Sequence, residues 1–249
     1  MEPNGNNPAV QIRSLRKAFG AQTVLGGINL DIAKGETVTV LGRSGTGKSV
    51  LLKLIIGLQK PDEGTIELFG TEVTKLPLKE LNQVRKKLGF LFQQAALYDS
   101  LSVEENVAFP LRRHTNLSDA EISEQVHQML ARVGMENDLK KMPSGISGGM
   151  KKRVGLARAL ILNPEIILLD EPTAGLDPIT TEEIDELIKG LQEERKVTSM
   201  IVTHDLHSVG RLADRVVILK EGNVIAEGTP KEVKQSKDPF VIKFLESGL

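Results

Sequence analysis

The chain has no cysteine among its 249 residues, and only 3% of the residues are aromatic. The lack of cysteine excludes disulfides, thiolate metal sites and cysteine nucleophiles, and it is compatible with a reducing cytoplasm. An excess of positive charge is missing too, because 32 Lys and Arg residues stand against 33 Asp and Glu residues. No net field therefore attracts a nucleic-acid backbone, and we expect no nucleic-acid partner.

Long apolar runs are also absent. No window approaches the roughly 18 consecutive apolar residues of a membrane-spanning helix, and residues 1–8 lack the basic and apolar regions of a signal peptide. We therefore expect a chain that neither inserts into a membrane nor is secreted by that route. Residues 2–8 are all polar, Gly or Pro, which predicts a loose tail over 1–8 and a fold that begins near Ala9.

Hydrophobic patterning predicts an α/β core interrupted by a helical insert. Short apolar or alternating runs indicate strands over 10–15, 28–32, 37–41, 65–69, 166–169 and 197–203. Helices are expected over 48–56, 180–195, 206–213, from 229 and over 239–246, with a hairpin over 215–226. Residues 94–160 look helical, and Ser118 to Glu121 has the form of a capping box within them.

Residues 42–49 fit the pattern G-x-x-x-x-G-K-[ST] between a predicted strand and a predicted helix. Glycines let the backbone fold around a phosphate, Lys48 would reach the β and γ phosphates, and Ser49 would ligate Mg²⁺. An ordinary Gly-rich turn should match this pattern only about once in a hundred chains of this length. The expected nucleotide-binding residues of the loop are Gly42, Arg43, Ser44, Gly45, Thr46, Gly47, Lys48, Ser49 and Val50.

A second part of a phosphate site is offered by Asp170 and Glu171, which end the apolar run 166–169. Asp170 would hold Mg²⁺, directly or through water, and Glu171 would polarise the attacking water. Two acids that merely terminate a strand before Pro172 are the alternative. Because Asp170 and Glu171 occur together with Lys48 and its phosphate loop, the sequence favours a nucleoside triphosphatase.

Ser147, Gly148 and Gly149 open another predicted helix and create a second anion site far from the first in sequence. Read with the phosphate loop and the acidic pair, the string 146–150 resembles the signature motif of the ABC (ATP-binding cassette) ATPases, with Met150 in place of the usual glutamine. The resemblance extends over nearly the whole chain from about residue 10. It implies a single P-loop NTPase domain over 9–249, in which 9–93 and 161–249 form a RecA-like core with an antiparallel β region and 94–160 form a helical signature subdomain.

The resemblance also assigns single residues. Phe19 matches the aromatic that stacks on adenine, and Gln93 matches the Q-loop glutamine near Mg²⁺ and water. Asp177 matches the D-loop aspartate, and His204 matches the switch histidine that senses the γ phosphate. Each has a plainer interpretation, since Phe19 and His204 could be core residues and Gln93 a solvated loop residue. A metal site built from His204, Asp205 and His207 would find no further His or Cys cluster to complete its shell.

In ABC ATPases the signature motif caps the nucleotide of the opposite subunit, so the resemblance implies a head-to-tail homodimer with two composite sites. It implies ATP and Mg²⁺ as ligands, and an ATPase that works as the motor of a transporter beneath separate membrane subunits. The stretch after Gln93, with apolar Leu97, Tyr98, Val103 and Phe109, would contact the permease. A helical-subdomain core would use the same residues.

Several strings, at 93–98, 106–115 and 177–180 together with Met150, look most like ATPases of the Mla/Mce lipid-transport systems. This likeness implies a motor on the cytoplasmic side of the inner membrane that moves phospholipids to or from the cell envelope, with permease subunits and a Mce-domain substrate-binding protein. A small regulatory subunit is a further candidate partner. The alternatives are the ATPase of an amino-acid or other small-solute importer, a soluble ABC protein that acts on nucleic acid or ribosomes, and an ATP-binding regulatory module.

Overall fold

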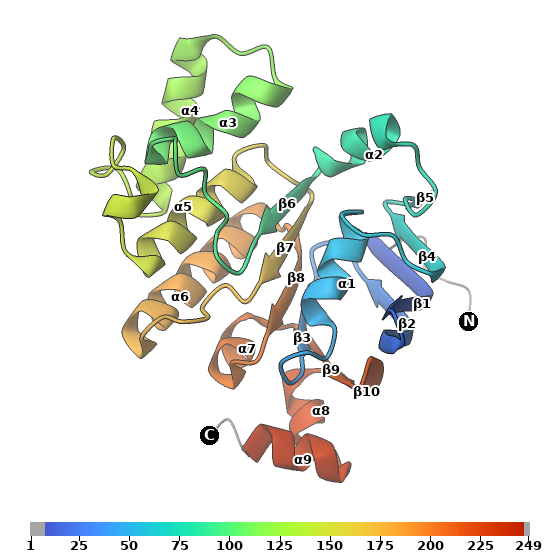
Figure 1. The fold of residues 1–249 in the computed structure, drawn as a ribbon. Coiled ribbons are helices and arrows are strands. Elements are labelled where there is room, and N and C mark those ends of the chain that lie inside the picture. The colour runs from blue at the N-terminus through green and yellow to red at the C-terminus, as the bar shows by residue number, and fades with distance from the viewer. Residues whose placement is uncertain (1–7, 247–249) are drawn as a thin grey trace.

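Two β-sheets organise the computed structural model, which describes residues 8–246 (Figure 1). A four-stranded antiparallel sheet has the order β2-β1-β4-β5, and a six-stranded sheet has the order β10-β9-β3-β8-β7-β6. The strands are β1 (Val10–Phe19), β2 (Gln22–Ile32), β3 (Thr37–Leu41), β4 (Glu63–Leu68), β5 (Thr71–Glu72), β6 (Leu88–Leu91), β7 (Ile166–Asp170), β8 (Thr198–Thr203), β9 (Arg215–Lys220) and β10 (Asn223–Gly228).

Helices cover both faces of the larger sheet. They are α1 (Lys48–Ile55), α2 (Leu78–Arg85), α3 (Val103–His114), α4 (Asp119–Arg132), α5 (Gly148–Leu160), α6 (Pro178–Arg195), α7 (Leu206–Leu212), α8 (Pro230–Lys234) and α9 (Pro239–Glu246). In Figure 1, α1 lies between the two sheets, whereas α5, α6 and α7 lie on the opposite side of the six-stranded sheet. Between residues 8 and 246 no helix is both long and apolar enough to cross a membrane.

The six-stranded sheet is parallel except for β10, and its central strands are buried on both faces. Successive side chains of a strand point to opposite faces of the sheet, so the side chains of β7 pack alternately on its two sides. Ile166 and Leu168 pack in the core shared with α1 and the smaller sheet, while Ile167 and Leu169 pack with the helices of the other face. The carboxyl ends of β3, β7 and β8 therefore meet at one edge, where the phosphate loop, the acidic pair and His204 follow.

The segment 94–160 contains three α-helices and a short 3-10 helix (Pro143–Gly145) joined by loops rather than one continuous helical stretch. Ser102 and Ser118 each begin a helix with a reciprocal capping box, which confirms the capping box predicted at Ser118. Helices α3, α4 and α5 bury a hydrophobic cluster that also receives one face of β6, β7 and β8. The signature helix α5 is therefore packed into the core sheet as well as into the helical segment.

Most predicted elements are present, but the sequence patterns missed α2, β5 and β6 and shortened β1 and β2. Strand β6 is only four residues long and is buried throughout, so it shows no alternation. Strand β2 continues through two glycines because its backbone is paired on both sides, with β1 and with the Gly222 carbonyl, which accepts the Gly26 N–H at 2.8 Å. Apart from Pro8, the loose tail expected over 1–8 lies outside the described residues.

Candidate active site

The phosphate loop connects β3 to α1 with its backbone open to an anion. Gly47 precedes the first helical residue in a left-handed conformation with φ 95°, and a Cβ there would lie 2.7 Å from a Leu25 methyl group and 2.9 Å from the Val24 carbonyl. No described side chain caps the start of α1, and its first turn contains no acidic residue. The free N–H groups and the dipole of α1 therefore favour a negatively charged ligand.

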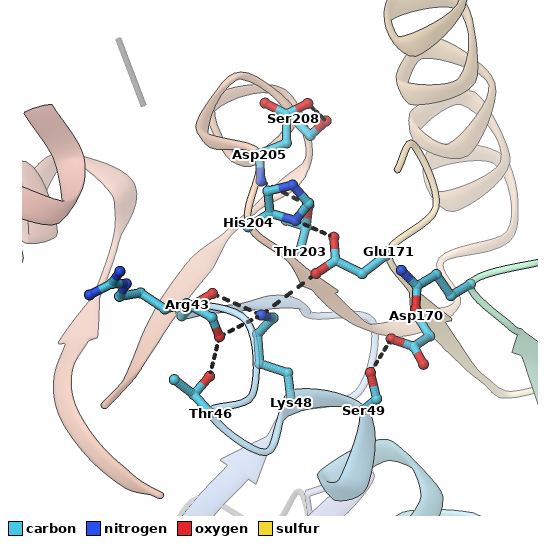
Figure 2. A network of polar contacts seen from close by, with 12 residues as sticks. Arg43, Thr46, Lys48, Ser49, Asp170, Glu171, Thr203, His204, Asp205 and Ser208 are labelled. Carbon is cyan, nitrogen blue, oxygen red and sulfur yellow. Dashed lines mark hydrogen bonds and ion pairs between the residues drawn. The ribbon is translucent and has the colours of Figure 1, made fainter. Parts of the chain in front are cut away.

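Lys48 folds back over this loop. Its ammonium donates to the Gly42 carbonyl at 2.8 Å and to the Arg43 carbonyl at 3.2 Å, and only 7% of the residue is exposed. The same ammonium lies 3.6 Å from Oε1 of Glu171, which comes from the end of β7 (Figure 2). The loop therefore holds a buried cation at the position where the phosphate charge of a nucleotide would need one.

Ser49 and Asp170 bring two hard oxygen donors together. The Ser49 hydroxyl donates to Oδ1 of Asp170 at 2.7 Å (Figure 2). Burial is the main cause that raises the pKa of Asp170, while the Ser49 hydrogen bond opposes that shift. A carboxylate with a raised pKa gains from a cation nearby, and Mg²⁺ prefers oxygen ligands of this kind. These two residues fit a Mg²⁺ site beside the phosphate loop.

Glu171 occupies the centre of the site. Its carboxylate lies between the Lys48 ammonium and the imidazole of His204, whose Nδ1 is 2.9 Å from Oε2 of Glu171 (Figure 2). The backbone of Glu171 has a left-handed φ of 48°, which is uncommon for a residue other than glycine. Its N–H donates to the Val202 carbonyl at 2.8 Å. A buried carboxylate oriented in this way can accept a proton from a water above the phosphate loop.

A cavity of about 770 Å³ joins these groups. Of the residues predicted for the site, those that line it are Phe19, Arg43, Ser44, Gly45, Gly47, Lys48, Ser49, Val50, Gln93, Glu171 and His204. Phe19 is 46% exposed, with the Lys17 ammonium 5.3 Å from its ring centroid. Gly42, Thr46 and Asp170 do not line this cavity but are hydrogen-bonded to residues that do, with the Thr46 hydroxyl donating to the Arg43 carbonyl at 2.9 Å.

The other predicted site residues lie away from this cavity in the described chain. Ser147 is exposed and caps α5 by accepting the Met150 N–H at 3.2 Å, and Gly148 is exposed beside it. A Cβ on Gly149 would lie 2.6 Å from the Thr180 methyl group, so this glycine allows the close packing of α5 on α6. Asp177 caps α6, and hydrogen bonds from the Thr180 hydroxyl and backbone hold the pKa of Asp177 below its ordinary value.

Four residues near the site had not been predicted from the sequence. Val24, Leu206 and Phe244 line the cavity. Lys152 is buried in α5, and its ammonium donates to the backbone carbonyls of Glu171, at 2.8 Å, and of Gln93. Burial lowers the pKa of Lys152 to about 8, against the attraction of the nearby carboxylates. No local signal marks Lys152, because it stands between Lys151 and Arg153 in the sequence and only the packing of α5 buries it.

Comparison with known proteins identifies the family. The family model described as "ABC transporter" matches residues 25–174. The chain belongs to the ABC transporter ATP-binding family. It resembles a dimeric ATP-binding cassette, MJ0796, solved with ADP and Pi, with a TM-score of 0.83, 37% sequence identity and coverage of 89% of this chain and 98% of that one. It also resembles cbiO1 of Clostridium perfringens, with a TM-score of 0.83, 34% identity and coverage of 98% and 96%.

Relatives of known sequence include the probable ribonucleotide transport ATP-binding protein mkl of Mycobacterium leprae, which is 42% identical over 95% of this chain and 68% of its own length. The intermembrane phospholipid transport system ATP-binding protein MlaF of Haemophilus influenzae is 41% identical over 97% of this chain and 91% of its own length. The chain spans 66% of mkl from Mycobacterium tuberculosis, or about two thirds. The predicted P-loop NTPase fold of the ABC type and the ATPase assignment are confirmed by these matches.

Proposed function

We propose that this ABC ATPase subunit drives a transporter that moves phospholipids between the inner membrane and the cell envelope, and that it lies on the cytoplasmic face of that membrane, bound through a permease. The similarity to MlaF supports this assignment, because it extends over 91% of that relative. A sulfate/thiosulfate import ATPase of Bacillus cereus is 41% identical as well, so solute import is the competing function. The strings at 93–98, 106–115 and 177–180 favour the lipid system.

The observation that carries the hydrolytic part of the proposal is the Glu171 carboxylate between the Lys48 ammonium and the His204 imidazole. In this proposal the 42–49 loop and Lys48 hold the phosphates, Phe19 stacks on adenine, and Glu171 orients and deprotonates the attacking water. Ser49, Asp170 and Gln93 would hold Mg²⁺, which would neutralise charge on the phosphate oxygens. His204 and Gln93 sense the γ phosphate.

The active unit in this proposal is a head-to-tail homodimer. Ser147, Gly148 and Asp177 are exposed in the single chain and lie outside its cavity, so they are free to complete the cavity of a second copy. The relative MJ0796 was solved as a dimer. Ser147 and the N-terminus of α5 would then meet the γ phosphate bound by the partner's loop.

Mixing two inactive variants tests the composite site. Lys48→Ala should remove the phosphate cation, and Ser147→Arg should block the signature surface, so each variant alone should lose ATP hydrolysis. In a random mixture half of the dimers are mixed and each has one intact site, so up to about a quarter of wild-type ATPase activity should return, and less if a filled second site is needed for full turnover. A mixture of Lys48→Ala with the double variant Lys48→Ala/Ser147→Arg is the control, because it contains no intact site. Equal inactivity of both mixtures would contradict the head-to-tail arrangement.

A groove of about 580 Å³ next to the Q-loop is the proposed permease contact. It lies between α2, β6, α3 and α5, and Tyr98 and Phe109 line it with exposed rings whose centroids are 4.9 Å apart. The expectation that Val103 contacts the permease is wrong, because Val103 is fully buried in the helical cluster. Leu97 is partly buried against the same cluster. Two exposed aromatic rings beside Arg113 and Arg158 suit an amphipathic helix of a membrane partner.

Identification of the membrane partner tests the substrate assignment. The Glu171→Gln chain should be tagged, extracted from its own membranes in mild detergent with ATP, and analysed by mass spectrometry for proteins and lipids. We expect a permease, a Mce-domain protein and phospholipid. The matched control is the same chain with Tyr98→Ala and Phe109→Ala, which should lose these partners because the groove loses its exposed rings. Recovery of a solute-type permease would replace lipid transport by solute import, and recovery of no membrane protein would favour a soluble ABC protein.

A further inference from the structure

We propose that Lys152 is a positioning residue that ties the signature helix to the catalytic carboxylate and to the Q-loop of the same chain. This inference rests on the assignment of Glu171 as the base in the proposed function. Lys152 stands on the second turn of α5, four residues after the helix begins at Gly148. The helix thus presents one end to the partner's nucleotide and this side chain to its own site.

The geometry of the Lys152 ammonium suits that role. It is buried, with 5% of the residue exposed, and it donates to two backbone carbonyls that belong to different loops. One is the carbonyl of Glu171 at the end of β7, at 2.8 Å, and the other is the carbonyl of Gln93 after β6. A single buried donor therefore links the Q-loop to the residue that carries the base.

Both loops contain backbone that needs such support. Glu171 has a left-handed φ of 48°, and Ala95 and Ala96 follow Gln93 with φ values of 58° and 48°. Non-glycine residues hold such conformations only when their surroundings fix them. Arg158, two turns further along α5, donates to the Ala95 carbonyl at 2.7 Å and to the Ala96 carbonyl at 2.9 Å. The same helix therefore holds the base and the Q-loop in their uncommon conformations.

This arrangement gives α5 a way to connect the two nucleotide sites of a dimer. A displacement of α5 on contact with the partner's nucleotide would be passed by Lys152 to the peptide of Glu171 and by Lys152 and Arg158 to the Q-loop. The position of the carboxylate relative to the attacking water would then depend on whether the other site is filled. A side chain that only fills the core would support the fold, but it would not make the hydrolysis rate at one site depend on nucleotide at the other.

Two substitutions separate these roles. Lys152→Met keeps an apolar stem that is shorter only by the terminal nitrogen and has no donor, whereas Lys152→Gln keeps two N–H donors on one nitrogen without the charge. ATP hydrolysis by the permease-bound complex should be measured over a range of ATP concentrations, with the thermal stability and ATP affinity of each variant. Lys151→Met is the matched control, since Lys151 is the preceding residue of the same helix and is more exposed.

We expect Lys152→Met to lower kcat about tenfold, because small misplacement of a catalytic group is costly, and to leave KM within about twofold. The proposal implies a Hill coefficient for ATP above 1 in the wild type, and Lys152→Met should bring it close to 1. Lys152→Gln should recover at least half of the lost kcat and the cooperativity, and Lys151→Met should behave as the wild type. An unchanged kcat and Hill coefficient in Lys152→Met would overturn the inference, as would an equal loss of activity and thermal stability in both Lys152 variants. If Glu171→Gln itself retained turnover, the proposed base would fail and the inference with it, whereas a failure confined to Lys152→Met would leave the proposed base intact.

Discussion

Replacing Glu171 by glutamine is expected to lower the rate of ATP hydrolysis at least about a hundredfold while ATP binding is retained. Glutamine has nearly the same shape, and its amide oxygen can still accept a hydrogen bond, but it cannot take a proton from water. The structure places this carboxylate 2.9 Å from His204 and 3.6 Å from the Lys48 ammonium, so the substitution changes the charge at the centre of the site and little else. The loss should therefore appear in kcat.

The same change should also favour the closed dimer. The Glu171 carboxylate and the γ phosphate are both negative, so removal of the carboxylate charge lowers their repulsion when ATP is bound. Lys48, which shares its ammonium between the loop carbonyls and Glu171, is then released toward the phosphate. Size-exclusion chromatography with and without ATP should show an ATP-dependent dimer in Glu171→Gln that is short-lived in the wild type.

A matched control lies just before the same strand. Glu165 immediately precedes β7, about half of its side chain is exposed, and it pairs with Lys87 at 2.9 Å far from the cavity. Glu165→Gln removes the same charge and should retain wild-type turnover. Single-turnover measurements on the permease-bound complex give the chemical rate without the influence of product release. Undiminished turnover in Glu171→Gln would show that another group acts as the base.

The phosphate site could be predicted because its signals are local. In the 42–49 loop, the glycines, the lysine and the serine are consecutive in sequence, and β3 and α1 on either side fix their geometry. The acidic pair comes directly after the apolar run 166–169 of β7, which sets its place at the carboxyl edge of the sheet. In both cases the strand that leads into the motif determines where the side chains of the motif lie.

Lys152, Leu206 and Phe244 could not be found in this way, because their positions depend on tertiary packing. Lys152 reaches Glu171 only because α5 packs against one face of β6 and β7, and Phe244 reaches the cavity from α9, at the end of the described chain. The signature residues illustrate the converse. Their motif was recognisable in the sequence, yet the single chain places them outside the cavity, and in the proposed dimer their ligand would be the nucleotide of the second chain.

Asp185 was given no role from the sequence, and the structure places it in a costly environment. It lies on α6 with none of its surface exposed, and within the described chain neither carboxylate oxygen has a hydrogen-bond partner. Arg211 approaches Oδ2 only to 3.9 Å and donates at 2.6 Å to Glu182 instead. The nearby Ser208 hydroxyl, which favours the ionised form of Asp185, donates to Asp205 at 3.1 Å.

Burial is the largest cause that raises the pKa of Asp185, from 3.8 to about 6, and the negative charges of Asp205 and Glu182 add to the shift. The folded chain therefore binds this proton more tightly than the unfolded chain does. Stability is greatest where Asp185 is protonated, and it decreases as the pH rises from 3.8 through 6 because the unfolded state then holds fewer protons. Above pH 6 the fold retains an ionised, buried carboxylate that lacks full pairing.

Asp185→Asn should consequently raise the free energy of unfolding at pH 8 by about 2 kcal/mol, since each pKa unit corresponds to about 1.4 kcal/mol and the amide leaves some polar groups unpaired. The advantage should shrink at pH 5, where the wild-type carboxyl is protonated. Urea unfolding followed by far-UV circular dichroism at both pH values measures the difference. Glu186→Gln, an exposed neighbour on α6, should change stability little at either pH. A variant less stable than the wild type at pH 8 would show that the Arg211 attraction outweighs the burial of the charge.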